Sequence, residues 1–124
     1  MKLHLLPLLA TALLMPPAHA AKWYFGADLS YVNEMEDCGA EYRDQGKPKD
    51  AFQLFRDHGA NLVRVRLWNN PDWTRYSNLA DAEKTLRRRN AAGMEPLLDF
   101  DYSDHWADGE KQIIPTDCAA HLHD

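Results

Sequence analysis

Three stretches of the chain carry the residue pattern of β-strands. Each is rich in apolar, aromatic or β-branched side chains and is bounded by turn-forming residues. They run from Trp23 to Ser30, from Asn61 to Trp68 and from Glu95 to Tyr102. Between them, apolar residues recur at intervals of three and four, which is the period of an amphipathic helix. The pattern therefore predicts the order β-α-β-α-β.

The two predicted helices have recognisable faces and ends. The first lies within residues 47–59, with Pro48 near its start and Gly59 at its end. One face of it is formed by Ala51, Leu54, Phe55 and His58. The second lies within residues 78–94 and ends at Gly93, and one face of it is formed by Leu79, Ala82 and Leu86. Helices of this length between strands indicate parallel strands joined by right-handed crossovers.

Two architectures contain such units, an open doubly wound sheet and a (β/α)8 barrel. No glycine-rich phosphate-binding motif follows any of the predicted strands, which argues against nucleotide-binding versions. The loops after the strands are long and rich in aromatic, amide and carboxylate side chains, whereas those after the helices are short. A (β/α)8 barrel builds its site at the carboxyl ends of its strands, so this distribution favours the barrel.

The second predicted strand places charges where an apolar strand is expected. Its alternation puts Val63, Val65 and Leu67 on one face and Arg64, Arg66 and Trp68 on the other. The third strand likewise separates Leu98, Phe100 and Tyr102 from Leu97, Asp99 and Asp101. If the two strands are parallel neighbours, two guanidinium groups lie beside two carboxylates, the condition under which buried charges are tolerated.

An open sheet with one solvent-exposed face and ordinary surface ion pairs is the simpler alternative. A parallel sheet is normally covered on both faces, however, so the arginine face is better explained as the lining of a cavity. The loops after the strands add Trp68, Asn69, Asn70, Trp73, Tyr102 and Trp106. Flat aromatic rings among hydrogen-bonding groups suit a sugar-binding cleft, because a sugar ring has an apolar face and a rim of hydroxyl groups.

The first twenty residues read as a secretory signal peptide. Lys2 precedes an apolar run from Leu5 to Met15, and Ala18-His19-Ala20 fits the cleavage rule. The apolar run is too short to cross a bilayer, which needs about 20 residues. We therefore expect an exported protein, secreted or periplasmic and not held in a membrane, whose residues 21–124 form one small domain.

Composition excludes several other classes of function. The net charge is −5, and basic residues are scattered apart from the run Arg87 to Arg89, so no nucleic-acid-binding surface is expected. Export would permit a disulfide between Cys38 and Cys118, and their pairing is left open. No zinc-binding spacing is present. The stretch from Asp99 to Glu110 imitates a calcium-binding loop but has Asp104 where the sharp turn needs glycine, so no metal is expected.

Two long segments resemble a known family. They are "FGADLSYVNEMEDCGAEYRDQGKPKDAFQLFRDHGANLVRVRLWNNPDW" and "AAGMEPLLDFDYSDHWAD". Together they resemble, from about Trp23 to Asp108, the N-terminal part of glycoside hydrolase family 53, the arabinogalactan endo-β-1,4-galactanases. The resemblance implies an α/β fold consisting of the first three β/α units of a (β/α)8 barrel, which is therefore incomplete. It also implies retaining hydrolysis of β-1,4-galactosidic bonds in arabinogalactan or pectic galactan, without a cofactor.

The resemblance also assigns candidate substrate-binding residues. Arg64 occupies the position of an inward arginine that the family keeps near its catalytic carboxylates, and Arg66 shares its face. The other positions that match the lining of the family's cleft are Asp28, Trp68, Asn69, Asp99, Tyr102 and Trp106. Two departures stand near the end of the match. Asp101 replaces a histidine of the motif, which changes the charge of the cleft wall, and Gly109-Glu110 replaces Pro-Gly.

No catalytic residue is expected in this chain. Retaining hydrolysis needs two carboxyl groups about 5 to 5.5 Å apart, which in the family are glutamates that follow strands four and seven. None of Glu34, Glu36, Glu41 and Glu110 matches either position. The departures and the three-strand length suggest a fragment or a truncated reading frame. We expect such a piece, with an open edge strand, to fold poorly alone and to hydrolyse nothing.

Two other functions stay open at this point. The chain could be a non-catalytic carbohydrate-binding fragment that uses the aromatic side chains of the cleft. It could also be an open α/β domain of unrelated function, in which the arginines and aspartates form structural ion pairs. The sequence does not indicate an oligomeric state.

Overall fold

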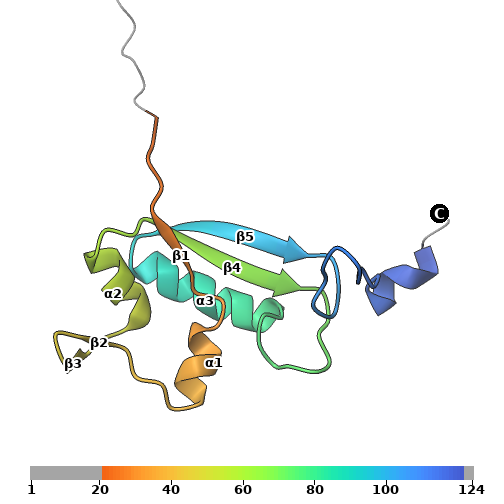
Figure 1. The fold of residues 1–124 in the computed structure, drawn as a ribbon, viewed down its shortest axis with the longest axis horizontal. Helices are drawn as coiled ribbons and strands as arrows, with labels where there is room; N and C mark the ends of the chain where they lie inside the picture. The colour runs from red at the N-terminus through yellow and green to blue at the C-terminus, as the bar shows by residue number, and fades with distance from the viewer. Residues whose placement is uncertain (1–20, 122–124) are drawn as a thin grey trace, which may run out of the picture.

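The computed structural model describes residues 21–121 (Figure 1). The predicted signal peptide lies outside the described residues. The main sheet has three strands in the order β1-β4-β5, all parallel. Its strands are β1 (Gly26–Asp28), β4 (Leu62–Trp68) and β5 (Glu95–Asp101).

A short antiparallel hairpin is formed by β2 (Arg43–Asp44) and β3 (Lys47–Pro48). The helices are α1 (Val32–Asp37), α2 (Ala51–Asp57), α3 (Leu79–Ala91) and the 3₁₀ helix η1 (Thr116–His121).

The predicted parallel strands and their crossovers are confirmed. β4 lies in the centre of the sheet, with Leu62 opposite both Gly26 of β1 and Glu95 of β5. A Cβ atom on Gly26 would lie 2.7 Å from the backbone oxygen of Leu62, so glycine is required where β1 approaches β4. β4 and β5 agree with the prediction to within one residue at each end.

The first strand is shorter than predicted. The prediction ran from Trp23 to Ser30, whereas β1 covers only three residues. Before its start, the Asn61 side chain accepts a hydrogen bond from Phe25 N and donates one to Trp23 O, beside one backbone bond from Asn61 N to Phe25 O. At its end, Ser30 N donates to the Asp28 carboxylate and the chain turns into α1. Side chains therefore satisfy the backbone groups at both ends.

Both predicted helices are present, and local contacts explain where they begin. Asp50 caps α2 by accepting hydrogen bonds from Phe52 N and Gln53 N, and Asn78 caps α3 by accepting one from Asp81 N. Gly59 and Gly93 follow the two helices with positive φ angles, as expected for glycines that end a helix. Helix α1, the hairpin and η1 were not predicted, because each is too short to show a clear period.

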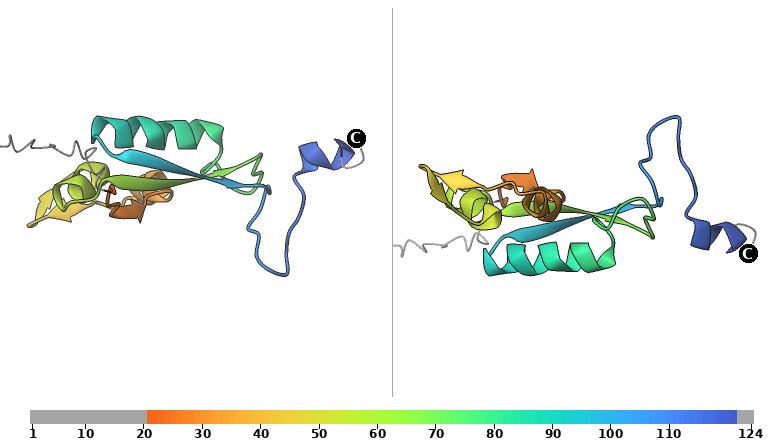
Figure 2. Two further views of the ribbon diagram at one scale, coloured as in Figure 1. Left: turned by 90° about the horizontal axis from the view of Figure 1, so that it is seen from above. Right: turned by 90° about the horizontal axis from the view of Figure 1, so that it is seen from below.

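All three α-helices cover the same face of the sheet. Figure 1 shows them below the strands, and Figure 2 shows α3 alongside β5 while α1 and α2 lie on the β1 side. As predicted, Val63 and Val65 point to this face and are fully buried there. They belong to a core cluster of Leu29, Val32, Ala51, Phe52, Ala60, Val63, Val65, Ala82 and Met94. The opposite face of the sheet carries no helix within residues 21–121.

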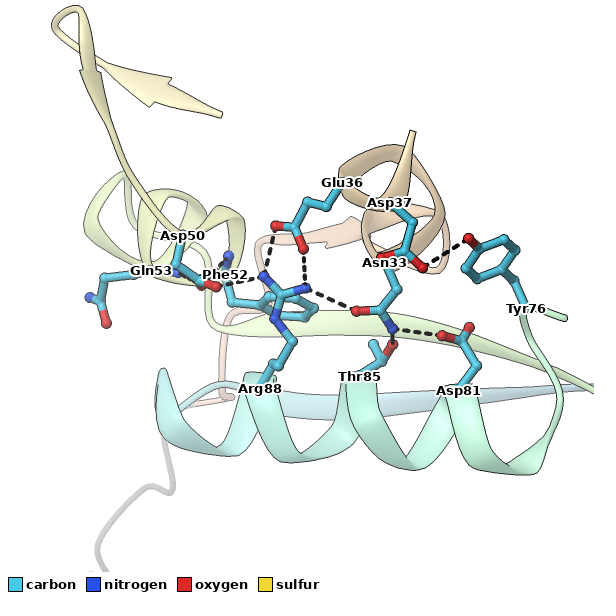
Figure 3. Close-up of polar contacts among 10 residues, drawn as sticks. All are labelled: Asn33, Glu36, Asp37, Asp50, Phe52, Gln53, Tyr76, Asp81, Thr85 and Arg88. Carbon is cyan, nitrogen blue, oxygen red and sulfur yellow. Dashed lines mark hydrogen bonds and ion pairs between the residues drawn. The ribbon is translucent and has the colours of Figure 1, made fainter. Parts of the chain in front are cut away.

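Arg88 ties the three helices together (Figure 3). From α3 it donates to both carboxylate oxygens of Glu36 on α1, at 2.6 and 2.8 Å. It also donates to Asp50, the cap of α2, at 2.6 Å. Its guanidinium carbon lies 4.6 Å from the centre of the buried Phe52 ring. One side chain thus bonds or stacks against two other helices.

A second polar contact joins α1 to α3 (Figure 3). Asn33 is buried, and its Nδ2 donates to Asp81 Oδ1 at 2.7 Å and to Thr85 Oγ1 at 2.9 Å. Its carbonyl oxygen accepts from Arg88 Nη1 at 2.9 Å. The buried amide therefore has its polar atoms satisfied, which fixes the position of α1 against α3. Within residues 21–121, no helix has both the length and the apolar character needed to cross a membrane.

Replacing Arg88 with Met should destabilise the fold. The change keeps most of the side-chain volume but leaves two partly buried carboxylates without their partner, which should cost about 2 kcal/mol. Arg87→Met is the matched control, because Arg87 is 70% exposed and pairs with Glu83 on its own helix. That pair should contribute about 0.5 kcal/mol or less. Urea unfolding of a complete barrel that contains residues 21–124 measures both, because the three-strand piece alone is expected to fold poorly. Equal midpoints for the two variants would contradict the role of Arg88.

Candidate functional site

Arg64 lies at the centre of the uncovered face of the sheet. From β4 its Nη1 donates to Asp28 Oδ2 of β1, and its Nη2 donates to Asp99 Oδ2 of β5. The three side chains are 39%, 37% and 39% exposed. The predicted meeting of arginine and aspartate side chains is confirmed for Arg64 and Asp99, whereas Asp101 bonds Trp68 and not Arg66. One guanidinium joins all three parallel strands and remains accessible from the open side.

The Asp28 carboxylate is held on both of its oxygens. Oδ1 accepts from Ser30 N at 3.0 Å and from Ser30 Oγ at 2.6 Å, while Oδ2 receives Arg64. Ser30 Oγ in turn accepts from Arg66 N at 2.9 Å. Burial works to raise the pKa of Asp28, but the hydrogen bonds from Ser30 and Arg64 outweigh it and hold that pKa below its ordinary value. Asp28 is therefore a fixed anion.

Arg66 is buried among aromatic rings. Its side chain is 4% exposed, and its guanidinium carbon lies 4.1 Å from the Trp106 ring centre, 4.9 Å from Tyr31 and 5.0 Å from Trp68. Such contacts attract a cation to the negative face of a ring. The Asp28 carboxylate is 3.9 Å from Nη2. Arg66 Nη1 has no hydrogen-bond partner among residues 21–121.

Four aromatic side chains form a continuous group beside the two arginines. This aromatic cluster consists of Tyr31, Trp68, Trp73 and Trp106. Trp68 is buried at its centre, with the rings of Trp73 and Trp106 edge-on to it at 5.0 Å. The other three rings are about half exposed. The cluster thus offers apolar ring surface next to charged groups, the combination that a sugar ring can use.

Asp101 orients the central tryptophan. Its Oδ2 accepts a hydrogen bond from Trp68 Nε1 at 2.6 Å. The Asp101 carboxylate thus provides the acceptor for the buried indole N–H. A buried indole N–H normally has such a partner.

Two predicted site residues lie apart from Arg64. Tyr102 is 83% exposed, and its ring stacks on Phe100 at 6.3 Å, on the other face of β5. Tyr102 lines a hollow of about 680 Å³ with the segment 107–114. Asn69 follows β4, and its amide donates to Asp104 Oδ1 at 3.3 Å. The part of these two residues in substrate binding stays a prediction. The same holds for the other predicted site residues, which are Asp28, Arg64, Arg66, Trp68, Asp99 and Trp106.

Sequence reasoning missed two residues of this region. Tyr31 and Ser30 follow β1, the strand whose carboxyl end was placed two residues too late. Tyr31 directly follows even the predicted end at Ser30, so the rule that used the residues after β4 indicates Tyr31 as well. Ser30 carries no such signal, because small hydroxyl side chains are common in turns.

The other reactive side chains serve local structure. Glu36 pairs with Arg88 on the helix side, and Glu41 pairs with Arg43 next to the hairpin. Cys38 and Cys118 are both exposed and free, so the structure does not pair them. Within the described part of the chain, no three potential metal ligands come together. The arrangement can bind and orient a polar ligand, but the lowered pKa of Asp28 is the opposite of what a general acid requires.

Comparison with known proteins agrees with the geometry. The family model for glycosyl hydrolase family 53 matches residues 24–124. An arabinogalactan endo-beta-1,4-galactanase from Cellvibrio japonicus is 59% identical over 123 residues, covering 94% of this chain and 32% of that relative. An endo-beta-1,4-galactanase from Bacillus subtilis is 40% identical over 98 residues, covering 73% of this chain and 23% of that relative.

Solved structures agree as well. A structure described as one of two fungal beta-1,4-galactanases superposes with a TM-score of 0.71 at 36% identity, covering 75% of this chain and 28% of that chain. The GH53 catalytic domain of Ignisphaera aggregans superposes with a TM-score of 0.72 at 30% identity, covering 83% of this chain and 31% of that domain's chain.

The chain thus spans at most about a third of the length of these relatives. Its three parallel strands and their helices are part of a (β/α)8 barrel, as predicted, and the described residues do not close one. The uncovered sheet face corresponds to the inside of such a barrel, where its enzymes carry their inward-facing side chains. The chain belongs to glycosyl hydrolase family 53.

Proposed function

We propose that this chain forms the first β/α units and one cleft wall of an endo-β-1,4-galactanase. The observation that carries the proposal is the placement of Arg64, ion-paired to Asp28 and Asp99, on the uncovered face beside the aromatic cluster. The relatives named above are galactanases, which favours a hydrolase over a non-catalytic binding fragment. The substrate would be arabinogalactan or pectic galactan, hydrolysed with retention at the anomeric carbon.

The aromatic rings and the charged side chains would have different roles. The half-exposed rings of Tyr31 and Trp106 would stack on the apolar face of galactose, while Asp99 would accept hydrogen bonds from its hydroxyl groups. Arg64 cannot turn freely, because carboxylates hold both of its terminal nitrogens. A fixed positive charge of this kind stabilises negative charge on nearby carboxylates without reorganising during the reaction.

We also propose that residues 1–124 are inactive by themselves. A retaining glycosidase needs a nucleophile and an acid/base carboxyl group about 5 to 5.5 Å apart. Asp28 and Asp99 are both engaged by Arg64, which leaves neither free for these roles. The two glutamates would come from other β/α units of a complete barrel. The signal-like residues 1–20 support export to the periplasm or the medium.

A chimera tests the proposed function directly. Residues 21–124 would replace the corresponding N-terminal residues of the Cellvibrio japonicus relative, to which they are 59% identical. The chimera should release reducing ends from galactan, because this chain would supply the cleft wall and the relative the catalytic glutamates. The purified 124-residue chain should release none.

The same assay separates the alternatives. A folded chimera without galactanase activity would contradict the proposed function. Release of reducing ends by the isolated chain would contradict its proposed inactivity. Saturable binding of galactan by the isolated chain, together with an inactive chimera, would support the non-catalytic binding fragment.

Removing the charge of Arg64 should reduce catalysis. In the chimera, Arg64→Leu should lower kcat/KM about 100-fold, because a fixed charge beside the reacting carboxylates is lost. Arg43→Leu is the matched control, since Arg43 is an exposed arginine of the hairpin that pairs with Glu41. The control should retain wild-type kcat/KM. Similar values for Arg64→Leu and Arg43→Leu would place Arg64 among ordinary structural ion pairs.

Acid should release Arg64 by protonating Asp28. The folded-state pKa of Asp28 is lowered, so the stability from its ion pair is fully present above about pH 4 and is lost as the pH falls through the folded pKa. The chimera should therefore lose less stability between about pH 4 and pH 2 when it carries Asp28→Asn. Urea midpoints across this range measure the difference.

A further inference from the structure

The loops that follow β4 and β5 meet at Asp104. Its Oδ1 accepts from Asn70 N at 2.9 Å and from Asn69 Nδ2 at 3.3 Å, both in the loop after β4. Its Oδ2 accepts from Thr116 N at 2.9 Å, at the start of η1. One carboxylate therefore joins three segments that are far apart in the sequence.

The backbone of Asp104 adds a contact to the aromatic cluster. Its carbonyl oxygen accepts the indole N–H of Trp73 at 2.9 Å. Trp106 lies two residues further along the same loop, edge-on to Trp68. Between them, His105 stacks on Trp73 with ring centres 6.1 Å apart. Two outer rings of the cluster, Trp73 and Trp106, thus belong to the two loops that the Asp104 side chain joins.

Sequence reasoning did not indicate the connection that the Asp104 side chain makes between these loops. It is buried, and the backbone N–H groups of Thr116 and Asn70 hold its pKa below the ordinary value. Charge-assisted hydrogen bonds to backbone N–H groups are stronger than neutral ones. The carboxylate is therefore held in its charged form by the loops that it connects.

Asp108 provides a contrast within the same loop. Its Oδ1 accepts from Glu110 N at 2.8 Å and from Lys111 N at 2.7 Å, and these bonds likewise lower its pKa. Both donors lie within three residues of Asp108, so its hydrogen bonds stabilise a local turn. Asp104 is buried and binds backbone groups of distant segments, whereas Asp108 is exposed and binds only those of its own turn.

We propose that Asp104 is a positioning residue of the galactan cleft, which holds Trp73 and Trp106 in place for the sugar by tying together the loops that carry them. This inference rests on the proposed function for its substrate. Asp104 need not touch the sugar. Its effect is transmitted through the two rings, whose separation and tilt decide whether a sugar face fits against them.

Asp104→Asn in the chimera tests this role. The amide replaces one acceptor oxygen with an NH₂ group, so Asn70 N or Thr116 N loses its acceptor. KM for galactan should rise about tenfold, because the rings are no longer held, while kcat stays close to that of the parent. Asp108→Asn is the matched control and should change neither constant. A purely structural defect would instead reduce the active fraction, lowering kcat at unchanged KM, and that result would overturn the proposal.

Hydrogen exchange supplies a readout that does not depend on activity. Mass spectrometry of the same chimera should show faster exchange in peptides covering Asn70 and Thr116 when Asp104 is replaced with Asn. Asp108→Asn should affect only the peptide covering Glu110 and Lys111. Equal exchange in the two variants, or unprotected Asn70 and Thr116 amides in the parent, would overturn the positioning role even if the chimera were an active galactanase. An inactive chimera with the expected exchange would refute the proposed function alone.

Discussion

The shared ion pair of Arg64 determines the character of the whole sheet. A guanidinium in the middle of a parallel strand needs partners, since an unpaired charge at such a place is costly. Asp28 on one neighbouring strand and Asp99 on the other supply them. The pairing works only with β4 in the centre and with the observed register, so the charge on one residue constrains all three strands. It also keeps this face polar, which suits the lining of a cleft.

The opposite face follows a different rule. There Val63 and Val65 pack against the helices, and the polar groups lie further out, where Arg88 joins α3 to α1 and α2. Arg64 therefore forms ion pairs between strands, and Arg88 forms ion pairs between helices. Arg66 is a third case, because rings surround its guanidinium and its Nη1 has no partner among residues 21–121.

Some of these features were predicted from the sequence, and others were not. The strands β4 and β5, the helices α2 and α3 and the two-faced sheet followed from periodicity, because each element is long enough to show its period. The pairing of Arg64 with Asp99 followed from the same alternation, whereas its pairing with Asp28 was not predicted. Helix α1 and the hairpin were missed because they are short. Tyr102 was grouped with the cleft both by its place at the end of the third strand and by family resemblance. Its alternation on the strand, however, placed it on the face of Phe100, where the structure has it.

The contacts between loops could not be predicted. Asp104 accepts hydrogen bonds from backbone N–H groups of Asn70 and Thr116, and every residue except proline has such a group, so the sequence offers no specific signal. The same applies to the hydrogen bond between Ser30 and the backbone of Arg66. Periodicity reports which face a side chain occupies, whereas loop contacts depend on how the ends of several strands come together in space.

A crystal structure of the chimeric barrel with bound β-1,4-linked galactotriose would test the central claim most directly. The account predicts that the sugar lies over the uncovered face of β1, β4 and β5, with a ring against Trp106 and with Arg64 still bonded to Asp28 and Asp99. A galactotriose bound elsewhere in the barrel, with the Arg64 face covered by other side chains, would contradict it.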